Sequence, residues 1–194
     1  ELAILFGQSE VVLELIKQRV NTELPILVGE REKVELDAVG FAVMRGEVEL
    51  DAVGFAVMRG ELECVKCLVV KGSCSLERNY SRIGNLLHVA IHFNQYAALK
   101  DLLGVHKDQT RALIERPNET GLTPLSMAAS LGELEPIEIL TEAGASLECK
   151  DREQRRPMHH AARGCHYDAI QLLAAKGAKI APTDFRGERP LDLL

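Results

Sequence analysis

Aromatic residues and long hydrophobic runs are scarce in this chain of 194 residues. Phe, Tyr and Trp together make up 4% of the residues, and Trp is absent. Hydrophobic residues nevertheless make up 46%, so we expect a core of Leu, Ile, Val and Ala, as is typical of stacked helices. No uncharged apolar stretch approaches the roughly 20 residues that span a bilayer, and no basic start leads into an apolar run. The sequence therefore predicts neither membrane insertion nor a secretory signal.

Cysteine is also scarce and forms no disulfide framework. The five cysteines are an odd number without regular spacing, which predicts reduced thiols in a cytoplasmic protein, with the nucleus as the alternative. Cys64 and Cys67 form a C-x-x-C pair followed by Cys74, but no second ligand pair follows at zinc-finger spacing. Metal or redox chemistry is therefore the weaker interpretation of these thiols, which otherwise pack as small hydrophobic groups. We expect no metal and no cofactor.

Catalytic motifs are missing as well. No Gly-rich loop of the P-loop or Rossmann kind is present, and the Asp-Phe-Arg-Gly string at 184–187 is read as the start of a loop, not as a kinase motif. His159, His160, Cys165 and His166 are close in sequence, but they do not assemble into a nucleophile, a base and an orienting group. We therefore predict that this chain is not itself an enzyme.

The chain has no excess of positive charge, since its formal net charge is −6. That value argues against nucleic acid, because affinity for a duplex comes mostly from neutralising phosphates with Lys and Arg. The charge is uneven, however. Residues 150–189 carry nine Lys and Arg against five Asp and Glu, whereas residues 98–149 carry four against nine. The C-terminal part is locally basic.

What the sequence does contain is an internal repeat of 33 residues. The Thr-Pro-Leu at 123–125 returns as Arg-Pro-Met at 156–158 and as Arg-Pro-Leu at 189–191, and the Ala pair at 128–129 returns at 161–162. A fixed period of this length is typical of helical repeat arrays, in which each unit contacts only its neighbours. Such arrays bind other molecules far more often than they catalyse reactions.

The unit that starts at 120 shows why two antiparallel helices are expected in each repeat. Thr123 can accept a hydrogen bond from a backbone N–H of the first turn, and Pro124 fits the first helical position because no donor is needed there. Gly132 then separates this helix from a second one over 133–142, and Gly144 supplies a left-handed ending. Arg156 and Arg189 replace the capping Thr in the later units, which we expect to be less rigid.

The unit at 153–185 resembles the ankyrin repeat. The family's Thr-Pro-Leu-His start, Ala-Ala pair, Gly-His turn and Leu-Leu before Gly-Ala are matched by Pro157, Met158, His159, Ala161, Ala162, His166, Leu172, Leu173, Gly177 and Ala178. The resemblance implies an all-α solenoid of stacked helix-turn-helix units with short β-hairpin-like loops. It also implies that His159 hydrogen-bonds the preceding loop and that partners bind in the concave groove between the loop tips and the first helices.

The same pattern predicts one ankyrin-repeat domain over 1–194, cut from a longer protein. We expect a truncated unit at about 1–20, a long connection at about 21–36, units at about 48–81, 82–119, 120–152 and 153–185, and a partial unit at 186–194. The stretch 104–119 is about five residues too long for the period and is expected to be an enlarged connection.

A segment of fourteen residues, VELDAVGFAVMRGE, occurs twice without change, at 34–47 and at 48–61. Nothing in repeat architecture requires the insert, so a recent duplication, a cloning feature or an error in the sequence record is the plain explanation. The alternative is a slippable helix, in which both copies compete for the same first-helix position. The second copy should then win, because it is directly joined to the helix that starts near residue 62.

The register of the repeat predicts which side chains line the groove. The candidates are the loop tips and the exposed sides of the first helices, although any single one could be an ordinary solvated side chain. They are Tyr80, Arg82, Phe93, Asn118, Leu122, Met127, Ser130, Leu131, Gln154, Arg155, His160, Arg163, Phe185 and Arg186. His160 is singled out because the repeat pattern assigns it no structural role.

We therefore predict a monomeric, non-enzymatic interaction module of a larger scaffold, adaptor or effector protein. Its partner is a protein or peptide, with acidic character where it meets the C-terminal end of the groove. The alternative is a substrate-recognition segment of a multidomain enzyme whose catalytic domain lies outside this chain.

Overall fold

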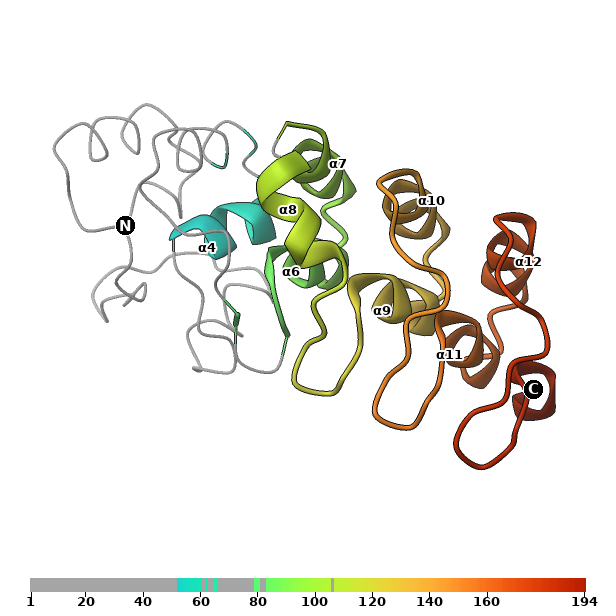
Figure 1. Cartoon of the computed structure of the whole chain (residues 1–194). Coiled ribbons are helices and arrows are strands. Elements are labelled where there is room, and N and C mark those ends of the chain that lie inside the picture. The colour runs from blue at the N-terminus through green and yellow to red at the C-terminus, as the bar shows by residue number, and fades with distance from the viewer. Residues whose placement is uncertain (1–51, 61, 63–64, 66–78, 81–82, 106) are drawn as a thin grey trace, which may run out of the picture.

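The structure is a computed structural model that describes residues 52–60, 62, 65, 79–80, 83–105 and 107–194 (Figure 1). Several predicted features lie outside these residues: the truncated unit at 1–20, the connection at 21–36, the first copy of the duplicated segment, and the Cys64, Cys67 and Cys74 set.

The described part of the chain is built from pairs of short helices. The first helices of the pairs are α4 (Ala52–Arg59), α6 (Leu86–His92), α9 (Pro124–Leu131) and α11 (Pro157–Arg163), followed by the 3-10 helix η1 (Pro190–Leu193). The second helices are α7 (Tyr96–Val105), α10 (Leu134–Glu142) and α12 (Tyr167–Ala175). The proline-led segments at 124, 157 and 190 therefore all begin helices, which confirms the predicted repeat.

The helices stack in two rows that run along the array. In the first row α4 packs on α6, α6 on α9, α9 on α11 and α11 on η1, while in the second row α7 packs on α10 and α10 on α12. Figure 1 shows the α6, α9 and α11 row with the α7, α10 and α12 row above it and the connecting loops projecting below. The core lies between the rows and is filled mainly by aliphatic side chains such as Leu99, Leu125, Ile137 and Leu140.

The start of each first helix follows from its capping residues. Thr123 Oγ1 accepts a hydrogen bond from the backbone N–H of Ser126 at 3.2 Å, and Pro124 occupies the first turn, as the sequence predicts. Arg156 forms no such cap, and its own backbone N–H donates to His159 Nδ1 at 3.2 Å. His88 accepts from the N–H of Asn85 in the same way, at 3.2 Å. At α6 the Asn85 side chain also accepts hydrogen bonds from the N–H groups of Leu87 and His88, so the histidine at the third helical position adds to a cap there and acts without one at α11.

The loops are hairpin-like turns with little β structure. Among the described residues there is no strand, and the only bridge pairs Tyr80 with Gly84. Three later loops share one construction at the positions of Asn118, Asp151 and Asp184. In each loop the side-chain Oδ1 accepts two backbone N–H groups, two and four residues later, and the backbone N–H donates to the carbonyl oxygen four residues later. One buried side chain therefore closes each turn.

The predicted enlarged connection at 104–119 is largely helical. It contains α8 (Lys107–Ile114), which packs on α7 and buries Leu113 and Ile114. Glu115, directly after α8, accepts a hydrogen bond from the backbone N–H of Ser146 at 2.6 Å and one from the thiol of Cys149. The extra residues therefore form an additional element that contacts the loop of the next unit.

Helix α4 belongs to the second copy of the duplicated segment. It packs on α6 and buries Val53, Ala56 and Val57, so this copy occupies a first-helix position. Because the first copy lies outside the described residues, competition between the two copies stays a prediction.

Candidate functional site

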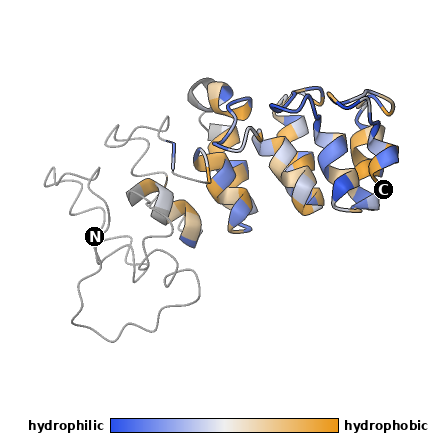
Figure 2. Cartoon of the chain, turned by 90° about the horizontal axis from the view of Figure 1, so that it is seen from below, coloured by the Kyte–Doolittle hydropathy of each residue, from blue (hydrophilic) through white to orange (hydrophobic). Residues whose placement is uncertain are grey.

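The loops and the first helices border an open depression on the side of the array where the groove was predicted. This groove hollow has a volume of about 380 Å³ and is lined by Thr120, Leu122, Ser130, Arg155, His160, Arg163 and Gly164. Five of these residues are among the predicted groove residues, from two loops and two first helices. Figure 2 shows the polar loops along one edge of the array, at one end of the helices.

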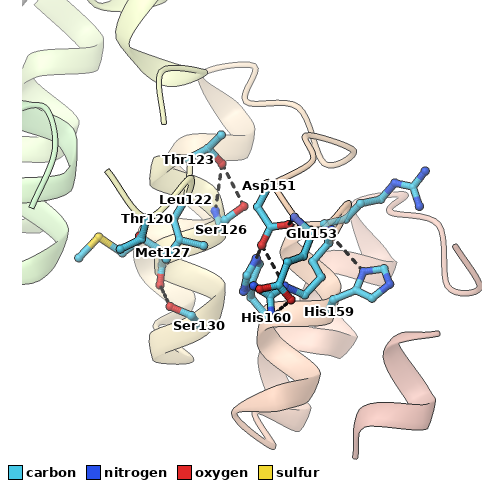
Figure 3. Close-up of polar contacts among 12 residues, drawn as sticks. Thr120, Leu122, Thr123, Ser126, Met127, Ser130, Asp151, Glu153, His159 and His160 are labelled. Atoms are coloured by element: carbon cyan, nitrogen blue, oxygen red, sulfur yellow. Dashed lines mark hydrogen bonds and ion pairs between the residues drawn. The ribbon is translucent and has the colours of Figure 1, made fainter. Parts of the chain in front are cut away.

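An acidic side chain that the sequence analysis did not single out sits beside the groove hollow. Asp151 Oδ2 lies 2.9 Å from Arg155 Nε and 3.1 Å from His160 Nε2 (Figure 3). Burial opposes the charge of Asp151, but hydrogen bonds from the Arg155 backbone and side chain and from the Glu153 backbone outweigh it and lower the pKa of the carboxyl. Asp151 therefore stays ionised and offsets part of the positive charge of Arg155.

His160 corrects a prediction. The repeat pattern assigned it no role and placed it toward the groove, whereas the structure buries it to 7% exposure against Asp151 while it lines the groove hollow. Burial lowers the pKa of His160 to about 4, and the charge of Arg155 and of Arg163 adds to this lowering, while Asp151 opposes it. The imidazole is therefore neutral at pH 7 and contributes no positive charge to the groove.

The positive charge of the groove comes from arginines. Arg163 is exposed, and Arg155 is half-buried between Asp151 and Glu153, whose Oε2 lies 3.0 Å from Arg155 Nη1. At the next loop tip the guanidinium of Arg186 stacks over the ring of Phe185 at 5.4 Å, and that ring is 60% exposed. Guanidinium groups can pair with carboxylates, and an exposed ring can stack on other planar groups.

Besides His160, three predicted groove residues are buried, and their placement at the surface was wrong. Tyr80 is 1% and Met127 9% exposed because both side chains pack into the hydrophobic core, and the Tyr80 backbone also pairs with Gly84. Asn118 is 8% exposed because its side chain closes a turn and its amide donates to the carbonyl of Ile83 at 3.2 Å. Their side chains hold the scaffold together.

The remaining predicted residues lie at other places. Leu131 is 45% exposed at the end of α9, and Phe93 is half-buried at the end of α6 with its ring 4.8 Å from that of His92. Gln154 is an exposed loop residue whose side-chain oxygen accepts a hydrogen bond from Lys150 at 2.9 Å. Arg82 lies outside the described residues.

The histidine of the repeat start has the predicted contact and a further one. His159 Nδ1 accepts from Arg156, the last residue of the preceding loop, as the resemblance implied. The equivalent His88 also reaches the following loop, where its Nε2 donates to the carbonyl of Leu122 at 2.9 Å. Burial lowers the pKa of His88 to about 4, although the Leu122 carbonyl opposes this, so the ring is neutral and connects two units.

Asp151 could have been found in the sequence. It lies 33 residues after Asn118 and 33 before Asp184, so it keeps the period of the repeat as faithfully as the proline does. Thr120 and Gly164 carry no comparable signal, because their place beside the groove hollow depends on how adjacent units pack.

No three His, Cys, Asp or Glu side chains in the described part of the chain are grouped so as to hold a metal ion. Within the same residues, no helix is long and apolar enough to span a bilayer.

Known proteins share this architecture. Residues 87–184 match the family described as ankyrin repeats (3 copies). The chain is 29% identical over 113 residues to the glycerophosphocholine phosphodiesterase GDE1 of Candida albicans, and this match covers 58% of the chain and 10% of that protein. It is 42% identical over 59 residues to Rabankyrin-5 of Mus musculus, which covers 30% of the chain and 5% of that protein.

A third relative is the Alpha-latroinsectotoxin-Lt1a of Latrodectus tredecimguttatus, with 26% identity over 125 residues that cover 64% of the chain and 8% of the toxin. The chain thus spans a tenth or less of the length of each of these relatives. Half of its own residues match the family, with the helix pairs and turns in the expected register. The chain belongs to the ankyrin repeat family.

Proposed function

We propose that this domain is the recognition part of a larger scaffold, adaptor or effector protein and binds a protein or peptide in its concave groove. Ankyrin repeats are non-catalytic modules that bind proteins. The observation that carries the proposal is the groove hollow, where Leu122, Ser130, Arg155, His160 and Arg163 meet from neighbouring units. A row of side chains from successive units is suited to an extended ligand, because each unit adds one patch of contact.

The ligand that fits the C-terminal end of the groove is acidic. Arg163 and Arg186 are exposed there, and Arg186 and Phe185 together present a planar cation on an aromatic ring. Arginine and aromatic side chains are common binding anchors because they bury a large area or form paired hydrogen bonds with carboxylates. The net charge of −6 disfavours nucleic acid, but the exposed arginines can still attract an acidic segment locally.

The test is a selection of displayed random peptides on the full chain, followed by affinity measurements with the enriched peptides. We expect enrichment of acidic residues and tighter binding at low salt. Charge reversal of an exposed arginine, Arg163→Glu, should weaken binding by about tenfold and reduce its salt dependence.

The matched control is Lys179→Glu, which makes the same charge change at an exposed site that does not line the groove hollow. It should change the affinity by less than about twofold. If no peptide is enriched, or if both reversals weaken binding equally, the groove is not the binding surface.

A second candidate function has one observation in its favour. The relative GDE1 is named as a phosphodiesterase, and the chain matches a tenth of its length. In that case this domain selects the substrate for a catalytic domain elsewhere in the same protein. A catalytic domain encoded beside this chain, with groove variants that raise KM and leave kcat unchanged, would establish this role.

Reduced thiols in the cytosol or nucleus and a monomeric state complete the proposal. Cys165 is an exposed free thiol, which suits a reducing compartment. Sedimentation of the full chain at several concentrations tests the monomer, since a dimer would raise its apparent mass as the concentration increases.

A further inference from the structure

The three second helices of the described units begin with the same kind of residue. Tyr96, Leu134 and Tyr167 are the first residues of α7, α10 and α12. Leu134 is 40% and Tyr167 61% exposed, and Leu131 at the end of α9 is 45% exposed. Together these four residues form what we call the turn-edge row, because each lies where a first helix ends or a second helix begins. Single exposed apolar residues are common on proteins, but here Tyr96, Leu134 and Tyr167 recur at one position of the repeat, with Tyr96 half-buried and the other two exposed.

The turns that carry this row are held firmly between units. His166 Nε2 hydrogen-bonds the carbonyl of Ser130 at 3.1 Å, and its ring packs so closely on the previous turn that a Cβ on Gly132 would lie 2.4 Å from it. Gln95 packs on Gly60 in the same manner, since a Cβ there would lie 2.3 Å from the Gln95 Oε1. The row is therefore presented on an ordered edge of the array.

Carboxylates flank the turn-edge row. Glu133 precedes α10, and Glu135 and Asp168 lie in the first turns of α10 and α12. Burial, then a hydrogen bond that the Tyr96 hydroxyl donates to Glu133, then the charges of Glu133 and Glu135 raise the pKa of Tyr96 to about 12. Acidic residues also stabilise a helix start through the helix dipole, but the partial charge of a helix end offsets only about half a unit charge. The edge keeps a negative potential.

Cations on the described elements do not cancel this potential at α10 and α12. Helix α10 contains no Lys or Arg, and Arg163, at the end of α11, offsets only part of the negative charge of Glu133, Glu135 and Asp168. Arg59 lies at the end of α4, before the α6–α7 unit. His92, at the end of α6, has its pKa lowered by burial. The turn edge is thus acidic and apolar, whereas the C-terminal end of the groove is basic.

We propose that the turn-edge row binds a basic amphipathic helix of a partner protein, at a surface separate from the groove. Packed helices lie about 8–10 Å apart, so the row repeats at about this distance. An α-helix rises about 1.5 Å per residue, so two of its turns, about seven residues, cover the same distance. Apolar residues two turns apart on the partner therefore meet successive units, and Lys or Arg beside them meets Glu133, Glu135 and Asp168.

The experiment measures binding of a synthetic helix to the full chain by fluorescence anisotropy. The probe is about 20 residues long, with Leu two turns apart on one face and Lys beside them. We expect saturable binding that weakens with salt, and none to the same peptide with Glu in place of Lys. The double variant Leu134→Ser, Tyr167→Ser should weaken binding by about tenfold or more.

The control for lost apolar surface is Leu191→Ser, because Leu191 is 55% exposed on η1 outside the row. It should leave the affinity within about twofold. Equal weakening by this control, or equal binding of the Glu peptide, would overturn the proposal, as would a failure of the Lys peptide to bind at all.

Two further measurements separate this proposal from the groove. Arg163→Glu should weaken the acidic peptides of the groove and leave the affinity for the basic helix unchanged or higher, because it removes a cation near Asp168, so either surface can fail without the other. If Arg163→Glu weakens the basic helix, its site is the groove and the turn-edge proposal is wrong. A dimer in sedimentation that Leu134→Ser abolishes would make a second copy of this chain the occupant instead.

Discussion

Certain residues of this repeat adopt the left-handed backbone conformation, and the sequence places glycine at only some of them. In three successive loops the equivalent residues are Gly121, Gln154 and Gly187, with φ of 87°, 62° and 81°. In the helix-to-helix turns Asn94 and Cys165 take the same conformation, with φ of 56° and 55°. Most side chains at such a position cost roughly 1–2 kcal/mol, a cost that glycine avoids and that Asn partly avoids.

Gln154→Gly is therefore expected to stabilise the domain by up to about 1 kcal/mol. The left-handed strain is removed, while the greater freedom of glycine in the unfolded chain and the lost hydrogen bond with Lys150 offset part of the gain. Urea unfolding monitored by circular dichroism measures the difference. The reverse change, Gly187→Ala, should destabilise by about 1 kcal/mol, because its Cβ meets no atom and only backbone strain remains. An unchanged midpoint for both variants would contradict this account.

Helix boundaries were the most predictable feature at the scale of the element. Thr123, Pro124 and Gly132 act locally, through one cap, one fixed φ and one left-handed residue, so their effect can be read from neighbouring residues alone. Helix α8 could not be read this way. Its apolar residues Leu113 and Ile114 become a buried face only because α7 lies beside them.

Buried histidines connect the elements of adjacent units and make stability depend on pH. The pKa of His88 and of His160 is about 4 in the folded protein, below the ordinary 6.5 of the unfolded chain. Between these values the unfolded state binds more protons, so this contribution to stability is full above pH 6.5 and is lost as the pH falls toward 4. We expect each histidine to add about 1.4 kcal/mol per pH unit to the slope between these limits.

His160→Gln should reduce the slope of unfolding free energy against pH by the contribution of one histidine. Urea unfolding at pH 7, 6 and 5 measures this slope. His88→Gln should do the same in a different unit. Lys176→Gln, at an exposed residue, serves as the control and should leave the slope unchanged. A slope that His160→Gln does not alter would show that folding does not lower the pKa of this ring.

At the scale of the whole molecule, each unit contacts only the units beside it. Leu140 in α10 and Leu173 in α12 are both fully buried, but α10 packs on α7, α9 and α12, whereas α12 lies in the last complete described pair. Either Leu→Ala change removes about 2–5 kcal/mol of local packing. In an array of coupled neighbours, the position of the defect decides how far its effect reaches.

Hydrogen exchange should show this difference. Leu173→Ala is expected to lower protection in α11, α12 and η1 while α6 and α7 keep theirs, because the end pairs can open without the rest. Leu140→Ala should lower protection in the units on both sides of α10. Uniform loss of protection in both variants would mean that the domain unfolds as a single cooperative unit.

The candidate site was only partly predictable from the sequence, because the packing of neighbouring units decides which side chains are exposed. The repeat register brought Leu122, Ser130, Arg155, His160 and Arg163 to one hollow. The same register wrongly predicted that Tyr80, Asn118 and Met127 are exposed. It assigns a residue to a loop or helix but does not show whether the next unit covers that residue. It also left out Leu134 and Tyr167, whose exposure depends on how the second helices stack.

The period of 33 residues, its proline-led helix starts and its scarcity of aromatics were enough to establish an ankyrin array and the order of its helices. These features act through contacts between residues near in sequence, which is why they can be recognised without coordinates. Which side chains are exposed, which histidines stay neutral and where charge of each sign gathers became apparent in the packed array. Those properties arise between units, from burial and from charged groups such as Asp151 and His160 that the stacking brings together.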